Sequence, residues 1–273
     1  MDTFNHLISS FFDLAFSPFS IFEPLIGLMV VSIVTGIIML IIFRYTSNQS
    51  AIRRIKNRIK AHFLEIRLYK DDLGAMMEAQ KHILRYNLTY MKHSLKPMLF
   101  LMIPVVLIMI QMSLWFDRYP LEPGKEIIVK LAFENQAQFN EDALLKTPEG
   151  ISVETPPLRI KEEKAIYWRI KALNPGKYYL EFILNSDILN KIIVVDDRLA
   201  RLSVKKVSPN LLQQVLYPAE KSFPKNLGID YIEINYPSIS YNLFGFQIHW
   251  LVIFFVVSIL TGFLLKKVFR VEI

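Results

Sequence analysis

The sequence contains no cysteine, which excludes disulfide bonds, thiolate zinc sites and cysteine nucleophiles. It also lacks three common catalytic or nucleotide-binding motifs: a glycine-rich phosphate loop, an HExxH zinc motif and a nucleophile elbow. Its five histidines show no metal-ligand spacing. We therefore expect no enzymatic activity, no cofactor and no metal site.

Charge is almost absent from three apolar windows of about 18–20 residues each, a length that crosses the hydrocarbon core of a bilayer as an α-helix. A core helix of a soluble protein rarely stays apolar on every face over that length. No acid or base lies in the middle of a window, which argues against a proton or ion pathway. We predict an integral membrane α-helical protein with transmembrane helices at 22–44, 97–117 and 248–268.

Basic residues are distributed unevenly between these windows. Residues 44–96 hold twelve Lys and Arg against four acids, residues 1–24 hold none, and residues 117–247 hold seventeen of each sign. Cytoplasmic loops carry the excess of Lys and Arg in membrane proteins. The pattern predicts that 44–96 and the basic tail to 273 are cytoplasmic, and that the N-terminus and 117–247 lie outside. The predicted location is a bacterial inner membrane.

The N-terminal segment 1–19 has an amphipathic helical pattern. Phe11 and Leu14 fall on its apolar side, whereas Ser9 and Asp13 fall on its polar side. Such a pattern is typical of a helix that lies in the membrane interface. We predict an interfacial helix on the outer leaflet.

Residues 47–94 have the three-and-four spacing of two amphipathic helices, with Ser47 or Asn48 as the N-cap, and predict an antiparallel coiled-coil hairpin. The predicted apolar seam consists of Ile52, Ile55, Ile59, Phe63 and Ile66 in the first arm and Met76, Met77, Ile83, Leu84, Leu88 and Met91 in the second. The methionines permit a second interpretation, because flexible thioethers also suit surfaces that bind varied partners.

The first arm of the hairpin is densely basic. The candidate contact residues at the inner mouth are Arg44, Arg53, Arg54, Lys56, Arg58 and Lys60. A topology signal that also contacts anionic membrane lipids explains them fully. Non-specific contact with ribosomal RNA is the alternative.

The outer segment changes to an alternating apolar pattern with turns such as Asn174-Pro175-Gly176. Short alternating strands predict an extracytoplasmic, immunoglobulin-like β-sandwich over 120–210. Residues 211–246 are less regular: a short helix is predicted around SPNLLQQVLYP, and a strand in IDYIEINY is predicted to lead back to the membrane.

The first and third windows resemble each other, VVSIVTGIIMLIIFR at 30–44 and VVSILTGFLLKKVFR at 256–270. Small residues let membrane helices approach closely, so helix packing is one interpretation. The other is a partly polar groove between the spans, whose candidate residues are Ser32, Thr35, Gln111, Ser113, Ser258 and Thr261.

The order of these elements resembles the three-span core of the YidC/Oxa insertase superfamily, most closely archaeal YidC-like proteins and the insertase subunit of the ER membrane complex. The resemblance covers 20–116 and 248–273. It rests on the first span into FRYTSNQ, the hairpin around RIKNRIKAHFLEIRLYKDDLGAMMEAQKHILRYN, and the second span KPMLFLMIPVVLIMIQ. YidC proteins carry an arginine inside the groove, whereas the candidate here, Arg44, lies at the inner membrane edge. The outer β-domain is an addition to the small members.

The resemblance implies a membrane-protein insertase or intramembrane chaperone that guides client transmembrane segments into the bilayer. Its implied partners are lipids, nascent membrane-protein clients and the ribosome. The alternative is a structural or scaffolding membrane protein, or a subunit of a larger complex, whose β-sandwich binds an envelope protein.

Overall fold

The computed structural model describes residues 2–18, 23–139, 142–184, 187–224, 227–243 and 245–272. It divides into a helical unit, Met29–Ile108 with Leu251–Ile273, and a β unit, Met1–Leu28 with Met109–Trp250. The link between the predicted interfacial helix and the first predicted span includes 19–22 and lies outside the described residues.

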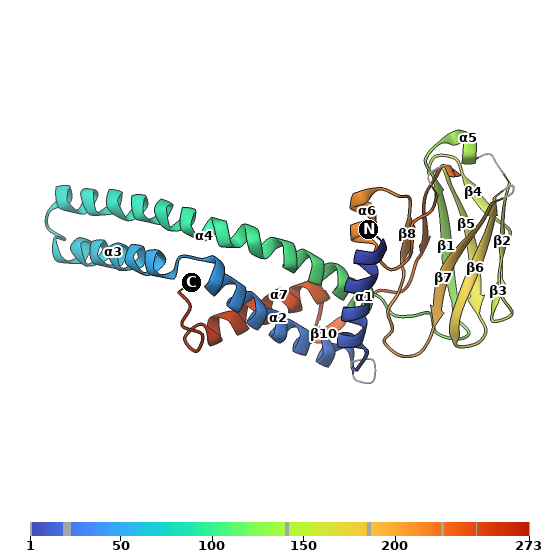
Figure 1. The fold of residues 1–273 in the computed structure, drawn as a ribbon, viewed down its shortest axis with the longest axis horizontal. Coiled ribbons are helices and arrows are strands. Elements are labelled where there is room, and N and C mark those ends of the chain that lie inside the picture. Colours follow the sequence, from blue (N-terminus) through green and yellow to red (C-terminus); the bar gives the residue numbers. More distant parts are fainter. Residues whose placement is uncertain are drawn as a thin grey trace. The chain divides into compact units, whose positions relative to one another are not determined.

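Among the described residues, two helices are long and apolar enough to cross a membrane, α2 (Pro24–Thr46) and α4 (Leu73–Phe116) (Figure 1). Helix α4 has 44 residues and continues without interruption through Pro97 and Pro104. The second arm of the predicted hairpin and the second predicted span are therefore one helix. No glycine or asparagine cap separates the two segments, so the prolines alone do not end it.

Helix α7 (Trp250–Leu265) is apolar but has only 16 residues. At a rise of 1.5 Å per residue it extends about 24 Å, less than the roughly 30 Å of a hydrocarbon core. The predicted span of 248–268 is longer than this helix, because Ile248 ends a strand and a turn follows Leu265. A third complete span therefore remains a prediction.

Helix α3 (Gln49–Leu68) follows α2 after two residues and forms the first arm of the hairpin (Figure 1). The Asn48 side chain accepts a hydrogen bond from the Ala51 amide at 3.0 Å and caps the helix, as its position in the sequence predicts. Asp72 accepts from the Ala75 amide at 3.1 Å at the start of α4. These two side chains define where each arm of the hairpin begins.

The β unit contains two antiparallel sheets packed face to face. One sheet has the strand order β3-β5-β1-β9-β8, with β4 also paired to β5, and the other has the order β2-β6-β7. The strands of the first sheet are β1 (Glu126–Phe133), β3 (Ile151–Val153), β4 (Leu158–Ile160), β5 (Ala165–Ala172), β8 (Lys205–Val207) and β9 (Ile229–Ile234). Those of the second are β2 (Ala143–Lys146), β6 (Gly176–Leu184) and β7 (Asp187–Val195). A separate hairpin joins β10 (Tyr241–Leu243) to β11 (Phe246–Ile248), and two short helices complete the unit, α5 (Gln136–Phe139) and α6 (Leu211–Leu216).

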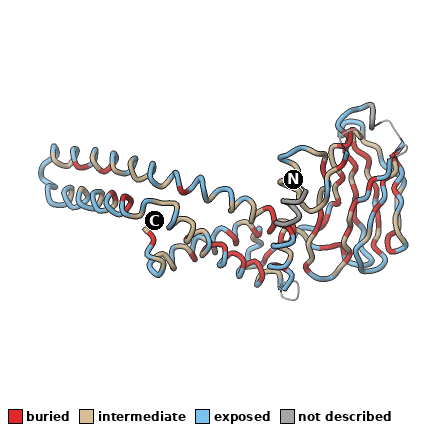
Figure 2. Tube along the Cα trace, viewed as in Figure 1, coloured by how far each residue is buried: buried red, intermediate tan, exposed pale blue. Residues whose placement is uncertain are grey.

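The core lies between the two sheets and consists of buried residues from both. These residues recur along the strands of the β unit (Figure 2). Trp168 of β5 contacts Phe182 of β6 edge to face, with ring centroids 5.6 Å apart. Both side chains are buried. Apolar burial of this kind is the main term that stabilises such a unit.

Strand β9 corrects the predicted end of the β-domain at residue 210. It lies between β1 and β8 in the first sheet, so part of the segment predicted as an irregular return, 211–246, supplies an interior strand. Ile232 and Ile234 alternate with Glu233 and point into the core. The segment is only six residues long, and a run this short does not reveal its pairing partner in the sequence.

Helix α1 (Asp2–Phe16) packs on the β unit through its polar side. Arg201 donates to Asp13 at 3.0 Å and to the Ser9 hydroxyl at 2.9 Å. Phe11 and Leu14 are exposed on the helix, 67% and 77% respectively. Because Ser9 and Asp13 face the protein, Phe11 and Leu14 face outward, as an interfacial helix requires. Phe16 is the exception, since it is buried against Trp115 and Phe116.

Candidate functional site

An apolar groove of about 320 Å³ is lined by α2, α4 and α7 in the helical unit. Apart from the hydroxyls of Thr35 and Ser258, its walls are aliphatic, aromatic or glycine. The lining residues are Thr35, Gly36, Met39, Leu40, Phe43, Leu101, Val105, Phe254, Phe255, Ser258, Ile259, Gly262 and Phe263. The groove therefore differs from the partly polar path that the sequence predicts.

The hydroxyls on α7 explain this difference. Ser258 donates to the Phe255 carbonyl at 3.1 Å, and Thr261 donates to the Val257 carbonyl at 2.8 Å. Such bonds to the preceding turn satisfy a hydroxyl within its own helix. These two side chains therefore contribute little polarity to the groove.

Helices α2 and α7 approach closely at Gly36. A Cβ atom at this position would lie 2.6 Å from the Ser258 carbonyl oxygen and 3.0 Å from the Thr261 Cβ. Only glycine fits so short a distance between two membrane helices. Gly36 of α2 and the Ser258–Thr261 stretch of α7 thus serve packing, and the groove is formed beside that contact.

The other predicted groove residues are divided between the two units. Ser32 and Thr261 are buried in the helical unit. Gln111 and Ser113 belong to the β unit, where Ser113 donates to the Ile110 carbonyl at 2.8 Å. The Gln111 Oε1 atom is buried and has no hydrogen-bond partner among the described residues. The structure therefore brings only Thr35 and Ser258 together in one groove.

The hairpin contains a polar aromatic cluster that the sequence analysis missed. His62 of α3 stacks on His82 and Tyr86 of α4, with ring centroids 4.9 and 5.5 Å apart. Arg58 donates to the Tyr86 hydroxyl at 2.8 Å and lies over its ring. The spacing of Ala79, His82 and Tyr86 on one face of α4 is the signal that could have identified this seam.

The apolar seam of the hairpin differs from the predicted one. Ile52, Ile55, Ala79 and Ile83 are buried. Five predicted members are more than half exposed, namely Phe63, Met77, Leu84, Leu88 and Met91. Helix α4 carries two apolar stripes, and only one of them can face α3. The other stripe is left on the surface of the hairpin (Figure 2).

The basic candidates belong to α3, apart from Arg44 in the last turn of α2. Arg44, Arg54 and Lys60 are exposed. Arg53 and Lys56 lie 4.0 and 3.5 Å from the Glu272 carboxylate. Arg58 contacts α4, because its guanidinium donates to the Tyr86 hydroxyl.

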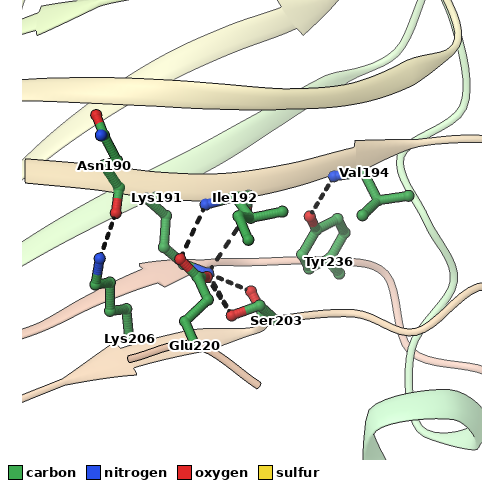
Figure 3. Close-up of polar contacts among 8 residues, drawn as sticks. All are labelled: Asn190, Lys191, Ile192, Val194, Ser203, Lys206, Glu220 and Tyr236. Atoms are coloured by element: carbon green, nitrogen blue, oxygen red, sulfur yellow. Dashed lines mark hydrogen bonds and ion pairs between the residues drawn. The ribbon is translucent and has the colours of Figure 1, made fainter. Parts of the chain in front are cut away.

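The β unit contains a buried ion pair between Lys191 of β7 and Glu220 (Figure 3). The Lys191 ammonium also donates to the Ser203 carbonyl and, at 2.8 Å, to the Ser203 hydroxyl. Glu220 accepts from the Ile192 amide at 3.2 Å. Burial lowers the pKa of Lys191, and the Glu220 carboxylate opposes that shift. The network joins the segments at 203 and 220 to β7.

Among the described residues, no group of three or more His, Asp or Glu side chains is placed to hold a metal ion.

Residues 10–143 match the EMC3/TMCO1-like family of integral membrane proteins. The matched region is just under half of the chain and contains α2, α3 and α4. This family belongs to the YidC/Oxa insertase superfamily and is associated with membrane-protein insertion. EMC3-like proteins are subunits of a larger membrane complex. No curated protein and no solved structure shows a significant match to the chain.

Proposed function

We propose that this protein is a non-enzymatic membrane-protein insertase or intramembrane chaperone. The observation that carries the proposal is the apolar groove between α2, α4 and α7 in a chain whose first half has the EMC3/TMCO1-like pattern. The groove receives side chains from one face of a client transmembrane helix. Its volume of about 320 Å³ accommodates several side chains. It does not accommodate a whole helix, which is about 10 Å wide.

Packing, rather than hydrophobicity, provides the attraction in this groove. Lipid tails are as apolar as the client, so helices associate in a membrane through van der Waals contacts. Met39, Phe254 and Phe255 offer adaptable or broad surfaces for such contacts. A weak, sequence-tolerant site of this kind releases its client into the bilayer.

The proposed topology places the hairpin and the C-terminal tail in the cytoplasm and the β unit outside, in a bacterial inner membrane. The supporting observation is the excess of Lys and Arg in 44–96. Helix α1 then lies in the outer interface with Phe11 and Leu14 toward lipid. The basic face of α3 contacts anionic lipid and the ribosome as a client arrives.

We assign the β unit an immunoglobulin-like architecture that holds an envelope partner. Two antiparallel sheets with a buried tryptophan support this assignment. The Tyr178 hydroxyl donates to the Asn174 carbonyl at 3.1 Å, four residues upstream, as in the tyrosine corner of such domains.

Photocrosslinking tests the proposed client site. A photoreactive amino acid at Met39 or Ile259, in the groove, is expected to capture nascent membrane proteins during synthesis into vesicles. The same amino acid at Val34 or Val256 is the control, because these side chains are exposed on the same helices but do not line the groove. Equal capture at both pairs of positions would contradict a specific client groove.

The outward stripe of α4 supports a second candidate function, that of a scaffold or complex subunit. Leu84, Leu88, Met91 and Leu95 are each more than half exposed and follow the four-and-three spacing of a coiled coil. Exposed apolar stripes of this length mark interaction surfaces. Lys81, Arg85 and Lys92 are exposed beside them. We therefore expect the partner to be an amphipathic helix with acidic flanks.

The double substitution Leu88→Glu and Met91→Glu is expected to reduce co-purification of such a partner in mild detergent by about tenfold, since it removes two apolar contacts. As the charge control, Asn87→Glu is compared with Leu88→Glu alone, because each adds one carboxylate and Asn87 is exposed but not a member of the stripe. If all variants retain the same associated proteins, the stripe is not a docking surface.

A further inference from the structure

A second cavity in the helical unit, of about 640 Å³, is strongly basic. It is bounded by the first two turns of α3 and by the segment that follows α7. Five cationic side chains and a single carboxylate, that of Glu272, line it. The five are Arg53, Lys56, Lys266, Lys267 and Arg270.

The segment after α7 is folded into a defined turn. The Val271 amide donates to the Lys266 carbonyl at 2.8 Å, and the Arg270 amide donates to the Lys267 carbonyl at 3.2 Å. This pair of bonds is the Schellman arrangement that ends many helices. Arg270 takes the left-handed position with φ of +53°, where glycine is usual and another residue costs about 1–2 kcal/mol. The turn thus holds an arginine where a glycine would be less strained.

The same turn is attached to α3. Val271 is buried, and the Glu272 amide donates to the Gln49 side-chain carbonyl at 2.6 Å. Glu272 also lies 3.5 Å from Lys56 and 4.0 Å from Arg53. Cations from two segments more than 200 residues apart in the sequence are therefore held around one cavity.

The charges in this cavity are poorly balanced. One carboxylate and five cations line the same cavity, and like charges that share a cavity repel each other. The ion pairs of Glu272 are partly exposed, and such pairs contribute about 0–1 kcal/mol. An anion with several oxygen atoms relieves the repulsion and displaces Glu272 at little cost.

We propose that this cavity binds the phosphate of an anionic phospholipid headgroup. Gln49 comes three residues after the end of α2, and Lys266 directly follows α7. Both segments therefore begin at the ends of apolar helices. The headgroup phosphates of a bilayer lie at the level of such helix ends. The ligand chemistry is a phosphate mono- or diester, and the position at the ends of two apolar helices favours a lipid over free phosphate. This proposal is independent of client binding in the groove.

The test uses the full chain in nanodiscs of phosphatidylcholine alone or with one-fifth phosphatidylglycerol or cardiolipin, and native mass spectrometry measures the lipid retained. The double substitution Lys267→Gln and Arg270→Gly is expected to reduce retained anionic lipid by about tenfold or more, since each basic residue contributes about 1 kcal/mol. Glycine suits the left-handed turn, so this variant should fold at least as well as the parent. Glu272→Gln is expected to increase retention, because it removes the competing carboxylate.

The control removes the same number of charges from α3 outside the cavity, with Arg54→Gln and Lys60→Gln. An equal loss of lipid in both double variants would overturn the proposal in favour of diffuse surface charge. The parent in phosphatidylcholine nanodiscs is also tested with inorganic phosphate. If it retains phosphate as well as it retains anionic lipid, the cavity is a free-phosphate site and the proposal is overturned. If the Lys267 and Arg270 double variant loses ribosome binding but retains its anionic lipid, the cavity binds RNA, and this result would also overturn the proposal.

Discussion

Replacing Glu220 with leucine is expected to reduce the free energy of unfolding of the β unit by about 3–5 kcal/mol. The substitution leaves the Lys191 ammonium fully buried without its carboxylate partner. It also removes the acceptor of the Ile192 amide. Hydrogen–deuterium exchange of β7 and β9 in the intact protein measures the loss.

The matched control is the double variant Lys191→Met and Glu220→Leu, which removes both charges. We expect it to recover most of the stability, since a well-packed apolar pair often replaces a buried ion pair without loss. If the double variant is as unstable as the single one, the pair acts through shape rather than charge.

The single variant should also show a pH dependence. Burial lowers the pKa of Lys191 from its ordinary value near 10.5, and Glu220 no longer opposes that shift. Between the native-state pKa and 10.5 the unfolded chain binds more protons than the native one, so stability rises with pH in that window. A flat profile for the single variant would contradict the lowered pKa of Lys191.

The substitution Gly36→Ala is expected to destabilise the helical unit by about 1–3 kcal/mol, the usual effect of overpacking. Its Cβ would lie 2.6 Å from the Ser258 carbonyl oxygen, which belongs to the backbone of α7 and cannot rotate away. Separation of α2 and α7 changes the groove walls, and we expect insertion of a model client in proteoliposomes to fall by about tenfold.

The sequence offers a closely matched control at Gly262 on α7. A Cβ at this position meets no atom within 4 Å, although Gly262 also lines the groove. Gly262→Ala should therefore leave thermal stability nearly unchanged. Equal effects of the two alanines would mean that helix flexibility, rather than the close contact at Gly36, is what matters.

Elements with long or repeated patterns could be predicted from the sequence. The apolar windows predict α2 and α4, because an uncharged run of this length has few stable environments other than a bilayer. Alternation predicts strands such as β5 and β6, where every second side chain faces the core. Asn48 as the cap of α3 follows from its place before the periodic residues.

Features that depend on a partner element could not be predicted. The pattern of α4 contains two apolar stripes, and the choice of Ala79 and Ile83 over Leu84 and Leu88 depends on how α3 packs. Strand β9 is short, and only its pairing with β1 and β8 shows that it belongs to the sheet. Nor could the sequence show that the Ser258 hydroxyl donates to the Phe255 carbonyl within its own helix.

The sequence by itself determined the apolar helices, the excess of basic charge between them and the alternating strands beyond. These properties depend on residues near one another in the chain, where hydrophobicity and charge act locally. The tertiary structure alone decided that the groove is apolar, that Gly36 joins two helices, and that the tail after α7 meets α3 in a basic cavity. Each of these depends on contacts between residues far apart in the chain, and such contacts arise only when the segments pack.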